Sequence, residues 1–398
     1  MAILGVWMWP QNVLKYGAKT VIAQCARSGI TDIFFLTKGL AGTTAFHGSY
    51  APHVCGRDLL RELTQAAHQR GIRVHAWFTS ACDEHYKRLY PESGRCHFTR
   101  GKDRELISLA DEGYLDYMEK IIREVSRAYD IDGLHLDYIR YNHLIYGWAE
   151  EDIVRYASHG ADPTRLRALM ERAYCLEQRE EHCLFDAYRA GDESVLALAR
   201  ARRADVVRFA SLLTQTAKEE NNDLILSAAL MPEGAYEDIA FSDLHYGQNY
   251  EDAAKLFDYA LPMAYSQAYG QNADWVRTVA EGTMKRGLRT IAGLHAFEGG
   301  TGLTLKSDIS ALKDTAVEGV CLFREGAFVM ARAENRELVL WNALEEEITE
   351  VKASCGEETF ALNEDIRSGE EKRWMLPFEA DTVQVFAGQT EKSVFLTK

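Results

Sequence analysis

The chain contains few prolines and fewer basic than acidic residues. Among its 398 residues there are only 7 prolines, and the 45 basic residues are outnumbered by 60 acidic ones. The formal net charge of -15 argues against nucleic acid and against an anionic membrane surface as partners, because both favour basic proteins. A neutral or cationic ligand fits this charge better.

Metal-binding and membrane signals are missing as well. The 8 cysteines are scattered without a C-x-x-C pair, so the sequence indicates neither a zinc site nor a redox motif, and we expect no metal and no cofactor. No segment approaches the ~20 apolar residues of a membrane span. The opening MAILGVWMWP has no basic segment and no long apolar core, so it is not typical of a signal peptide. We therefore expect a cytoplasmic protein without membrane contact.

What the chain does have is a regular alternation of strand and helix patterns, which is typical of a parallel sheet built from βα units. The helical patterns include 16–28, which ends at Gly29, and 57–70, which ends at Gly71. The eight predicted strands are Ile3–Trp9, Asp32–Thr37, Arg73–Ser80, a strand that ends at Asp137, Leu224–Met231, Tyr259–Tyr265, Arg289–His295 and Gly319–Phe323. This pattern predicts an α/β fold, a (β/α)8 TIM barrel over residues 1–332.

Two parts of the chain depart from the alternation. Residues 142–204 are rich in charge, helical in pattern and without a strand, so we predict a helical insertion after the fourth strand. Such an insertion is typical of a solvated lid or a dimer surface, which leaves a homo-oligomer as an open alternative. Residues 337–398 show short alternating runs with polar turns, which predict a small, β-sandwich-like accessory domain.

The fourth strand carries the most informative motif, YDIDGLHLDYIRY at residues 129–141. Successive side chains on a strand point to opposite faces, so Gly133, His135 and Asp137 share one face and the two leucines between them share the other. In a parallel barrel the leucines would face the helices. Asp137 would then lie at the carboxyl-end rim, where barrel enzymes carry out their chemistry. Asp132, at the start of the strand, is expected to be a structural hydrogen-bond partner at the opposite end.

Three sequence blocks carry a resemblance to a known family. They are VHAWF at residues 74–78, DGLHLDYIRY at 132–141 and LPMAY at 261–265, in this order. From about Ile3 to Val329 the chain resembles bacterial glycosyl-hydrolase-like barrels of the glycosyl hydrolase-like 10 type, and the strand-four block is the specific one. More distantly it is similar to amylase-type and chitinase-type barrels. The resemblance implies a (β/α)8 barrel that acts on a carbohydrate substrate.

The resemblance also suggests roles for single residues. Amylase-type barrels end strand four on a nucleophilic aspartate, with an arginine two residues before it; Asp137 matches, and His135 replaces the arginine. In chitinase-type barrels the acid is a glutamate, and Ile139 occupies its position here, so chemistry by that residue is not expected. Asp137 is therefore our candidate for the nucleophile or base of a glycoside hydrolase. Donors on its neighbours are expected to keep its pKa low; they are Tyr138, Arg140 and Tyr141.

Glycoside hydrolysis ordinarily needs a second carboxyl group across the bond. Glu233 is the first candidate, because strand five neighbours strand four in the barrel. Glu298, after strand seven, is the second, and Glu325 follows strand eight. The loop after strand three offers further carboxyl groups.

Further residues at strand ends suit a sugar, because aromatic rings stack on its C–H faces and polar side chains bind its hydroxyls. The predicted substrate-binding residues are Trp7, Trp9, Lys38, His75, Trp77, His135, Arg140, Tyr141, Tyr265 and His295.

Two alternatives to a two-carboxylate hydrolase stay open. A zinc hydrolase would require His75, His135, His295 and Asp137 to converge, although strand one lacks the HxH pair with which such barrels usually open. A carbohydrate-binding barrel without activity would lack a second carboxyl group within about 5 to 9.5 Å of Asp137.

Overall fold

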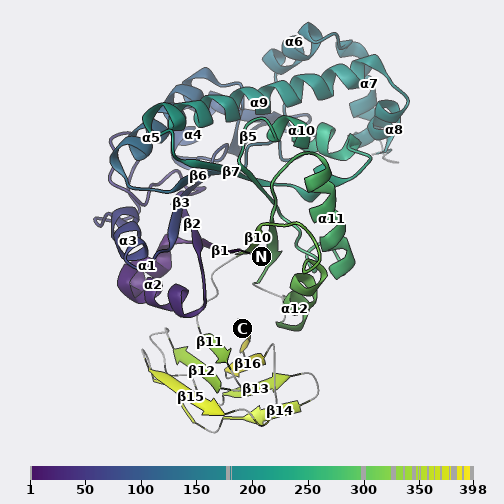
Figure 1. The fold of residues 1–398 in the computed structure, drawn as a ribbon. Coiled ribbons are helices and arrows are strands. Elements are labelled where there is room, and N and C mark those ends of the chain that lie inside the picture. Colours follow the sequence, from purple (N-terminus) through teal and green to yellow (C-terminus); the bar gives the residue numbers. More distant parts are fainter. Residues whose placement is uncertain are drawn as a thin grey trace.

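The computed structural model describes residues 2–175, 180, 182–296, 302–323, 329–334, 337–342, 347, 349, 351–355, 358–362, 364–367, 370–375, 377, 383–387 and 390–394. Eight strands form a nearly closed barrel in the order β8-β7-β6-β3-β2-β1-β10-β9, with helices around it (Figure 1). The two ends of this order meet through bridges between Ala260 and Thr290 and between Met263 and Gly293. The fold is therefore the predicted TIM-type α/β barrel.

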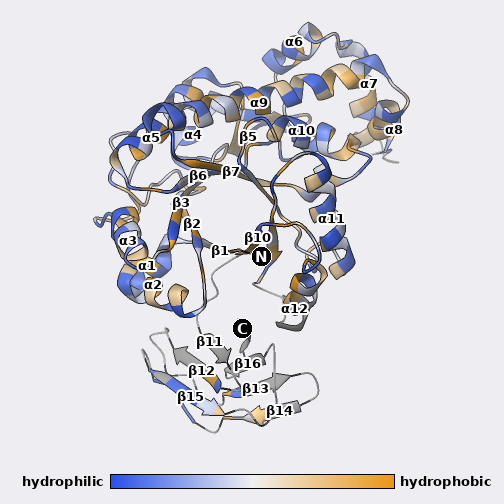
Figure 2. Cartoon of the chain, viewed as in Figure 1, coloured by the Kyte–Doolittle hydropathy of each residue, from blue (hydrophilic) through white to orange (hydrophobic). Residues whose placement is uncertain are grey.

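All neighbouring barrel strands that pair as a ladder are parallel. Their number and places agree with the predicted strands. They are β1 Ile3–Met8, β2 Asp32–Lys38, β3 Arg73–Thr79, β6 Gly133–Asp137, β7 Ile225–Leu230, β8 Tyr259–Pro262, β9 Ile291–His295 and β10 Gly319–Phe323. Figure 2 shows β7 as predominantly hydrophobic, as expected for a strand covered by helices on one face and by barrel side chains on the other.

Helices cover the outside of the barrel. They are α1 Pro10–Tyr16, α2 Ala18–Arg27, α3 Leu59–His68, α4 Glu84–Leu89, α5 Glu112–Ala128, α9 Glu193–Glu220, α10 Tyr250–Ala253, α11 Ala273–Lys285 and α12 Gly302–Ala311. The helix predicted over 16–28 is α2, and the short α1 before it was not predicted. Gly17 has φ 81° and separates α1 from α2, because this positive φ cannot continue a right-handed helix.

The stretch after β6 is helical, as predicted. It contains α6 Glu150–Ser158, α7 Pro163–Tyr174 and α8 Cys183–Arg189, which gather at one end of α9 in Figure 1. Their apolar faces form a separate core that includes Tyr156, Leu166 and Leu198. The long α9 belongs to both this core and the barrel wall, and its first turn is capped by the Asp192 carboxylate, which accepts from the Ser194 and Val195 amides.

Further short elements lie in the loops at the carboxyl ends of the strands. After β3 come η1 Pro91–Ser93 and a hairpin of β4 Gly94–His97 and β5 Gly101–Ile107. After β7 come η2 Pro232–Ala235 and the π-helical η3 Ser242–Tyr246. Within the described residues, no helix is both long and apolar enough to cross a bilayer.

The described strands after β10 are antiparallel and form two small sheets. One has the order β11-β12-β15, with β11 Val329–Glu334, β12 Glu337–Asn342 and β15 Glu371–Met375. The other has the order β14-β13-β16-β17, with β14 Glu358–Ala361, β13 Lys352–Cys355, β16 Val383–Ala387 and β17 Thr390–Val394. Because β11 already pairs with β12, this architecture begins inside the range 1–332 that was predicted for the barrel. The division into two domains stays a prediction.

Candidate active site

Asp137 is the last residue of β6, and its carboxylate accepts two N–H hydrogen bonds. Oδ1 accepts from the amide of Tyr138 at 2.7 Å, and Oδ2 accepts from the indole of Trp77 at 3.2 Å. The side chain is only 6% exposed. Burial raises the pKa of Asp137, although the charge of Arg140 and these two hydrogen bonds act to lower it. The expectation of a low pKa is therefore wrong, because desolvation outweighs the donors.

The backbone turns sharply directly after this carboxylate. Tyr138 has φ 55°, and within the described residues no other non-glycine residue has a positive φ. For an L-residue this left-handed conformation costs roughly 1–2 kcal/mol. Strained backbone is concentrated at functional sites, where the surrounding structure enforces it. Here the turn places the Tyr138 ring under Arg140, whose guanidinium lies 4.7 Å from the ring centroid.

Glu233 lies in η2, directly after β7 and beside the strand of Asp137. Its Oε1 accepts a hydrogen bond from the Tyr269 hydroxyl at 3.3 Å, and its Oε2 is buried without a hydrogen-bond partner. Burial raises the pKa of Glu233, and a backbone hydrogen bond, the hydroxyls of Tyr269 and Tyr246 and the Arg140 charge only partly oppose this. A carboxyl group with a raised pKa and an unoccupied oxygen has the properties of a proton donor.

Arg140 connects the two carboxyl groups electrostatically. Its charge lowers the pKa of both Asp137 and Glu233, yet within the described part of the chain it forms no salt bridge. The guanidinium lies instead 5.7 Å from the ring of Tyr246 and close to that of Tyr138. Its Nε is buried without a hydrogen-bond partner. Arg140 therefore retains donors for a ligand between the two carboxyl groups.

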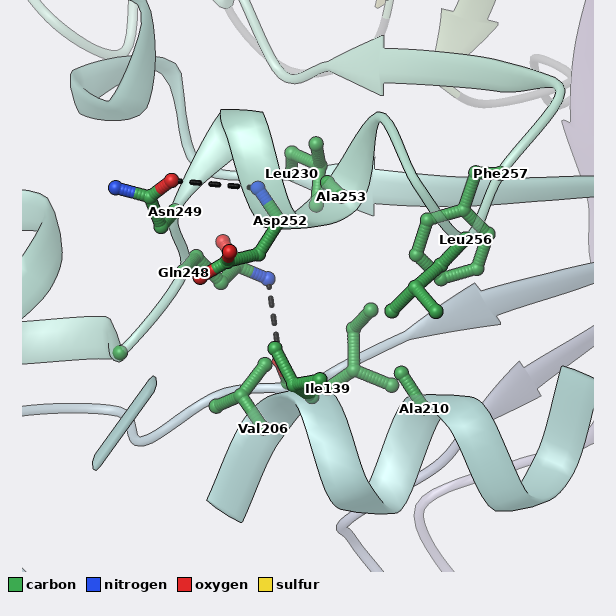
Figure 3. Close-up of a pocket in the computed structure, with 12 residues that line it drawn as sticks. Ile139, Val206, Ala210, Leu230, Gln248, Asn249, Asp252, Ala253, Leu256 and Phe257 are labelled. Atoms are coloured by element: carbon green, nitrogen blue, oxygen red, sulfur yellow. Dashed lines mark hydrogen bonds between the residues drawn. The ribbon is translucent and has the colours of Figure 1, made fainter. Parts of the chain in front are cut away.

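A side-chain amide fixes the two loops that carry these carboxyl groups. Gln248 donates from Nε2 to the carbonyl of Ile139 at 3.4 Å and accepts at Oε1 from the amide of Met231 at 3.0 Å. Ile139 follows Asp137 by two residues, and Met231 precedes Glu233 by two. Figure 3 shows Gln248 and Ile139 at a small apolar hollow between α9 and α10. Its volume of about 20 Å³ has room for about one water, so it is not a sugar site.

Several predicted ligand residues lie near Asp137. Trp77 contacts it directly, and the Asp137 charge, after burial, raises the pKa of Tyr265. The Tyr265 ring packs 5.6 Å from that of Phe323 and 5.5 Å from that of His295. Trp9, at the end of β1, is half-buried against the aromatic cluster in the barrel interior.

Other predicted ligand residues lie deeper in the barrel. His75 is paired with Asp32 at 2.9 Å and faces Gly133, where a Cβ would come within 2.3 Å of its Nδ1. One level higher, the Trp7 indole donates to Nε2 of His135 at 3.0 Å, so the neutral ring donates from Nδ1 to Ser227 at 2.9 Å. These are packing and hydrogen-bonding positions, because the register on β3 places them below Asp137. We therefore leave Trp7, His75 and His135 out of the proposed site.

Lys38 and Tyr141 are buried, and their polar groups bond to other residues of the protein. The Lys38 ammonium, fully buried, lies 2.9 Å from Asp83 and donates to the Cys82 carbonyl. Tyr141 is 1% exposed and donates its hydroxyl to Asp205 of α9. Since both polar groups have protein partners, we also leave these two residues out. Glu298 and Glu325 lie outside the described residues.

Two residues of the site, Tyr246 and Tyr269, carried no motif in the sequence. Tyr246 ends the π-helical η3, and burial followed by the Glu233 charge raises its pKa. Tyr269 follows the predicted Tyr265 by four residues, and this is the one local signal that could have found it. Within the described ranges, no three His, Cys, Asp or Glu side chains lie together as a metal site.

Comparisons with known proteins agree with this architecture. The family described as glycosyl hydrolase-like 10 matches residues 51–296. None of the curated proteins matches the chain.

Solved structures with the same fold include several glycosidases. The glycoside hydrolase domain of PgaB (BpsB) from Bordetella bronchiseptica has a TM-score of 0.63 at 13% identity, covering 81% of this chain and 94% of that one. The β-galactosidase of the psychrophilic Marinomonas ef1 has a TM-score of 0.60 at 13% identity, and the match covers 82% of this chain and 55% of that one. The catalytic domain of β-amylase from Paenibacillus polymyxa has a TM-score of 0.58 at 9% identity, and the match covers 81% of this chain and 92% of that one. Such identities show the fold alone, whereas the family match covers most of the barrel: the chain belongs to the glycosyl hydrolase-like 10 family.

Proposed function

We propose that the protein is a glycoside hydrolase that cleaves O-glycosidic bonds of an oligosaccharide or glycoside with two carboxyl groups, Asp137 and Glu233. The observation that carries the proposal is that Asp137 ends β6, Glu233 follows the neighbouring strand β7, and both carboxyl groups share the charge of Arg140. Family membership and the fold of the structural neighbours support it.

The hydrogen bonds suggest how the two roles are divided. Both oxygens of Asp137 accept from N–H groups, so the ionised form is stabilised where a nucleophile or base is needed. Glu233 keeps one oxygen without a partner, so its proton can be given to the leaving glycosidic oxygen. In a retaining reaction, Asp137 forms a bond to the anomeric carbon as the bond to the leaving oxygen breaks. A water molecule then attacks the anomeric carbon and displaces Asp137, while Glu233 takes a proton from that water.

Aromatic side chains around the carboxyl groups support a sugar as the ligand. Trp77, Tyr265 and His295 lie on the Asp137 side, and Tyr246 and Tyr269 lie on the Glu233 side. Arg140 supplies donors for hydroxyl groups between them. We propose Trp9 as a further contact because it ends β1 at the same rim.

A screen of aryl glycosides and oligosaccharides against the wild type and Asp137→Asn tests the proposal. We expect turnover of at least one glycoside by the wild type and a loss of several orders of magnitude in Asp137→Asn with the fold intact. Near-wild-type turnover in this variant would refute the assignment. Sugar binding without turnover by the wild type would favour the carbohydrate-binding alternative. Loss of activity in Glu233→Gln but not in Glu298→Gln would identify Glu233 as the acid.

A further inference from the structure

An open groove lies outside the barrel mouth, between α4, η1 and the first turns of α5, and Figure 1 shows α4 and α5 as neighbours. It is an open groove of about 550 Å³, within the range of small-molecule sites. Because α4 follows β3 and α5 begins before descending to β6, the groove lies at the same end of the barrel as Asp137. None of the residues proposed for hydrolysis lines it.

The groove is built on the buried ion pair of Lys38 and Asp83. Asp83 accepts at Oδ1 from the amide of Tyr86 and so caps α4, while Lys38 also contacts the hydroxyl of Tyr114 in α5 at 3.3 Å. Both charges are fully enclosed, so they hold α4 against α5 rather than meet a ligand. This explains why a strand-end lysine lies in the barrel wall.

Tyrosine rings form the wall of the groove. The ring of Tyr86 lies 4.6 Å from that of Tyr90 and 4.9 Å from that of Tyr117. Tyr90 is 47% exposed, and Tyr50, which also lines the groove, is 48% exposed. The hydroxyl of Tyr117 is buried and has no hydrogen-bond partner. Aromatic surface thus remains open to a ligand, and one polar atom remains unsatisfied.

The lining of the groove contains three carboxylates, of which that of Asp111 caps α5 by accepting from the Tyr114 amide. Glu92, Asp111 and Asp116 line the groove, and after burial their charges contribute to raising the pKa of Tyr86 to about 12. The Lys120 ammonium is held by Asp116 at 2.6 Å. His85, the other basic residue of the lining, lies against Arg88. Carboxylates beside aromatic faces attract organic cations, because the ring face carries negative charge.

We propose that this groove binds a protonated amino sugar of a glycan chain, as an accessory site separate from the catalytic mouth. The ammonium group would lie against Tyr86 and Tyr90, close to the carboxylate of Glu92, and the sugar ring would cover the exposed aromatic surface. That the amine is carried by a sugar rests on the proposed glycosidase function. The net charge of -15 is consistent with a cationic ligand.

Calorimetric titration in an Asp137→Asn background, which prevents hydrolysis, tests the proposal. The probes are a hexamer of glucosamine and a hexamer of N-acetylglucosamine, which differ in charge but not in length. We expect the glucosamine hexamer to bind about tenfold more tightly, and Tyr90→Ala and Glu92→Gln each to weaken it about fivefold, in the range of cation–π and exposed ion-pair energies. Val154→Ala, at an exposed residue of the insertion, is the control and is expected to bind like the background.

Equal affinity for the two hexamers would overturn the proposal. So would unchanged binding of the glucosamine hexamer in both groove variants, because the sugar would then occupy another site. Thermal unfolding of each variant shows whether a loss of binding reflects misfolding. These binding readouts do not depend on turnover, so a failed glycosidase screen and a failed groove test remain distinguishable.

Discussion

Asp32 and Asp137 are both buried aspartates of the barrel, yet their surroundings act on them in opposite ways. Burial alone would raise the pKa of Asp32, but hydrogen bonds from His75 and Arg73 lower it to about 2. Asp137 accepts only neutral N–H donors and feels Arg140 from beyond ion-pair distance, so burial dominates and its pKa is raised. The difference is a cationic partner within hydrogen-bond range, which Asp32 has in Arg73.

The deeper barrel interior and the rim can be compared by the hydrogen-bond partners of their buried polar groups. Below Asp137, both ring nitrogens of His135 have protein partners, whereas His75 bonds to Asp32 through Nε2 and has no partner at Nδ1. At the rim, Arg140 and Glu233 each have a buried polar atom without a partner. Such groups are costly to bury unless a ligand or water satisfies them. Because Nδ1 of His75 and other buried atoms of the described residues also lack partners, such atoms mark the candidate site only together with the raised pKa of Glu233 and the charge of Arg140 that the two carboxyl groups share.

The largest expected effect is a loss of activity on substitution of Asp137 that substitution of Asp32 does not cause. Asp137→Asn should lower kcat/KM by several orders of magnitude and leave the protein as stable as the wild type at pH 7, or more so. The reason is that a carboxylate with a raised pKa costs stability above its usual range. Asp32→Asn, as the matched control, should retain kcat in the folded protein. Steady-state kinetics and thermal unfolding of both variants measure this, and comparable losses of kcat in the two would remove the distinction.

The next effect concerns the second carboxyl group. Glu233→Gln should lower kcat/KM by about 10²- to 10⁴-fold, the usual contribution of a general acid. It should also remove the basic limb of the pH profile, since that limb reports deprotonation of Glu233. The acidic limb, which reports protonation of Asp137, should remain and lie above the usual aspartate range. A basic limb that survives in Glu233→Gln would assign the acid to another residue.

A smaller effect is expected on stability at Asp32. Its pKa near 2, against an ordinary value of 3.8, corresponds to about 2 kcal/mol of unfolding free energy at neutral pH, which Asp32→Asn should remove. Because the pKa is depressed in the folded state, this contribution is complete above about pH 4 and is lost as the pH falls through 2. Urea unfolding of both proteins between pH 7 and pH 2 should show the difference shrinking only in that window. A difference that is constant with pH would contradict it.

The smallest effect is expected at Tyr269. Its hydroxyl lowers the pKa of Glu233, so Tyr269→Phe should raise that pKa further and move the basic limb of the pH profile to higher pH. We expect kcat/KM to change only a few-fold, the size of one neutral hydrogen bond of about 1 kcal/mol. Tyr259→Phe, at the amino end of β8, is the control and should leave the profile unchanged. A shift to lower pH would contradict the role given to this hydroxyl.

Local patterns in the sequence determined the barrel and the place of Asp137. Alternating strands and helices predict the eight strands, and the period of two along β6 places Asp137 at its carboxyl end. The same period places Asp132 at the opposite end, where it accepts from His68 and from the amide of Val74. Such inferences succeed because they depend on neighbours in the chain.

Only the tertiary structure decided which strand residues reach the rim and how they are charged. The sequence suggests ligand roles for Lys38, His75 and His135. Their positions along the barrel axis and their bonding partners, however, depend on segments that are far apart in the chain. Tyr246 and Tyr269 reach Glu233 from separate loops, and burial reverses the pKa expected for Asp137. Desolvation and long-range partners are properties of the packed barrel, whereas the sequence specifies the strand and the face on which each side chain lies.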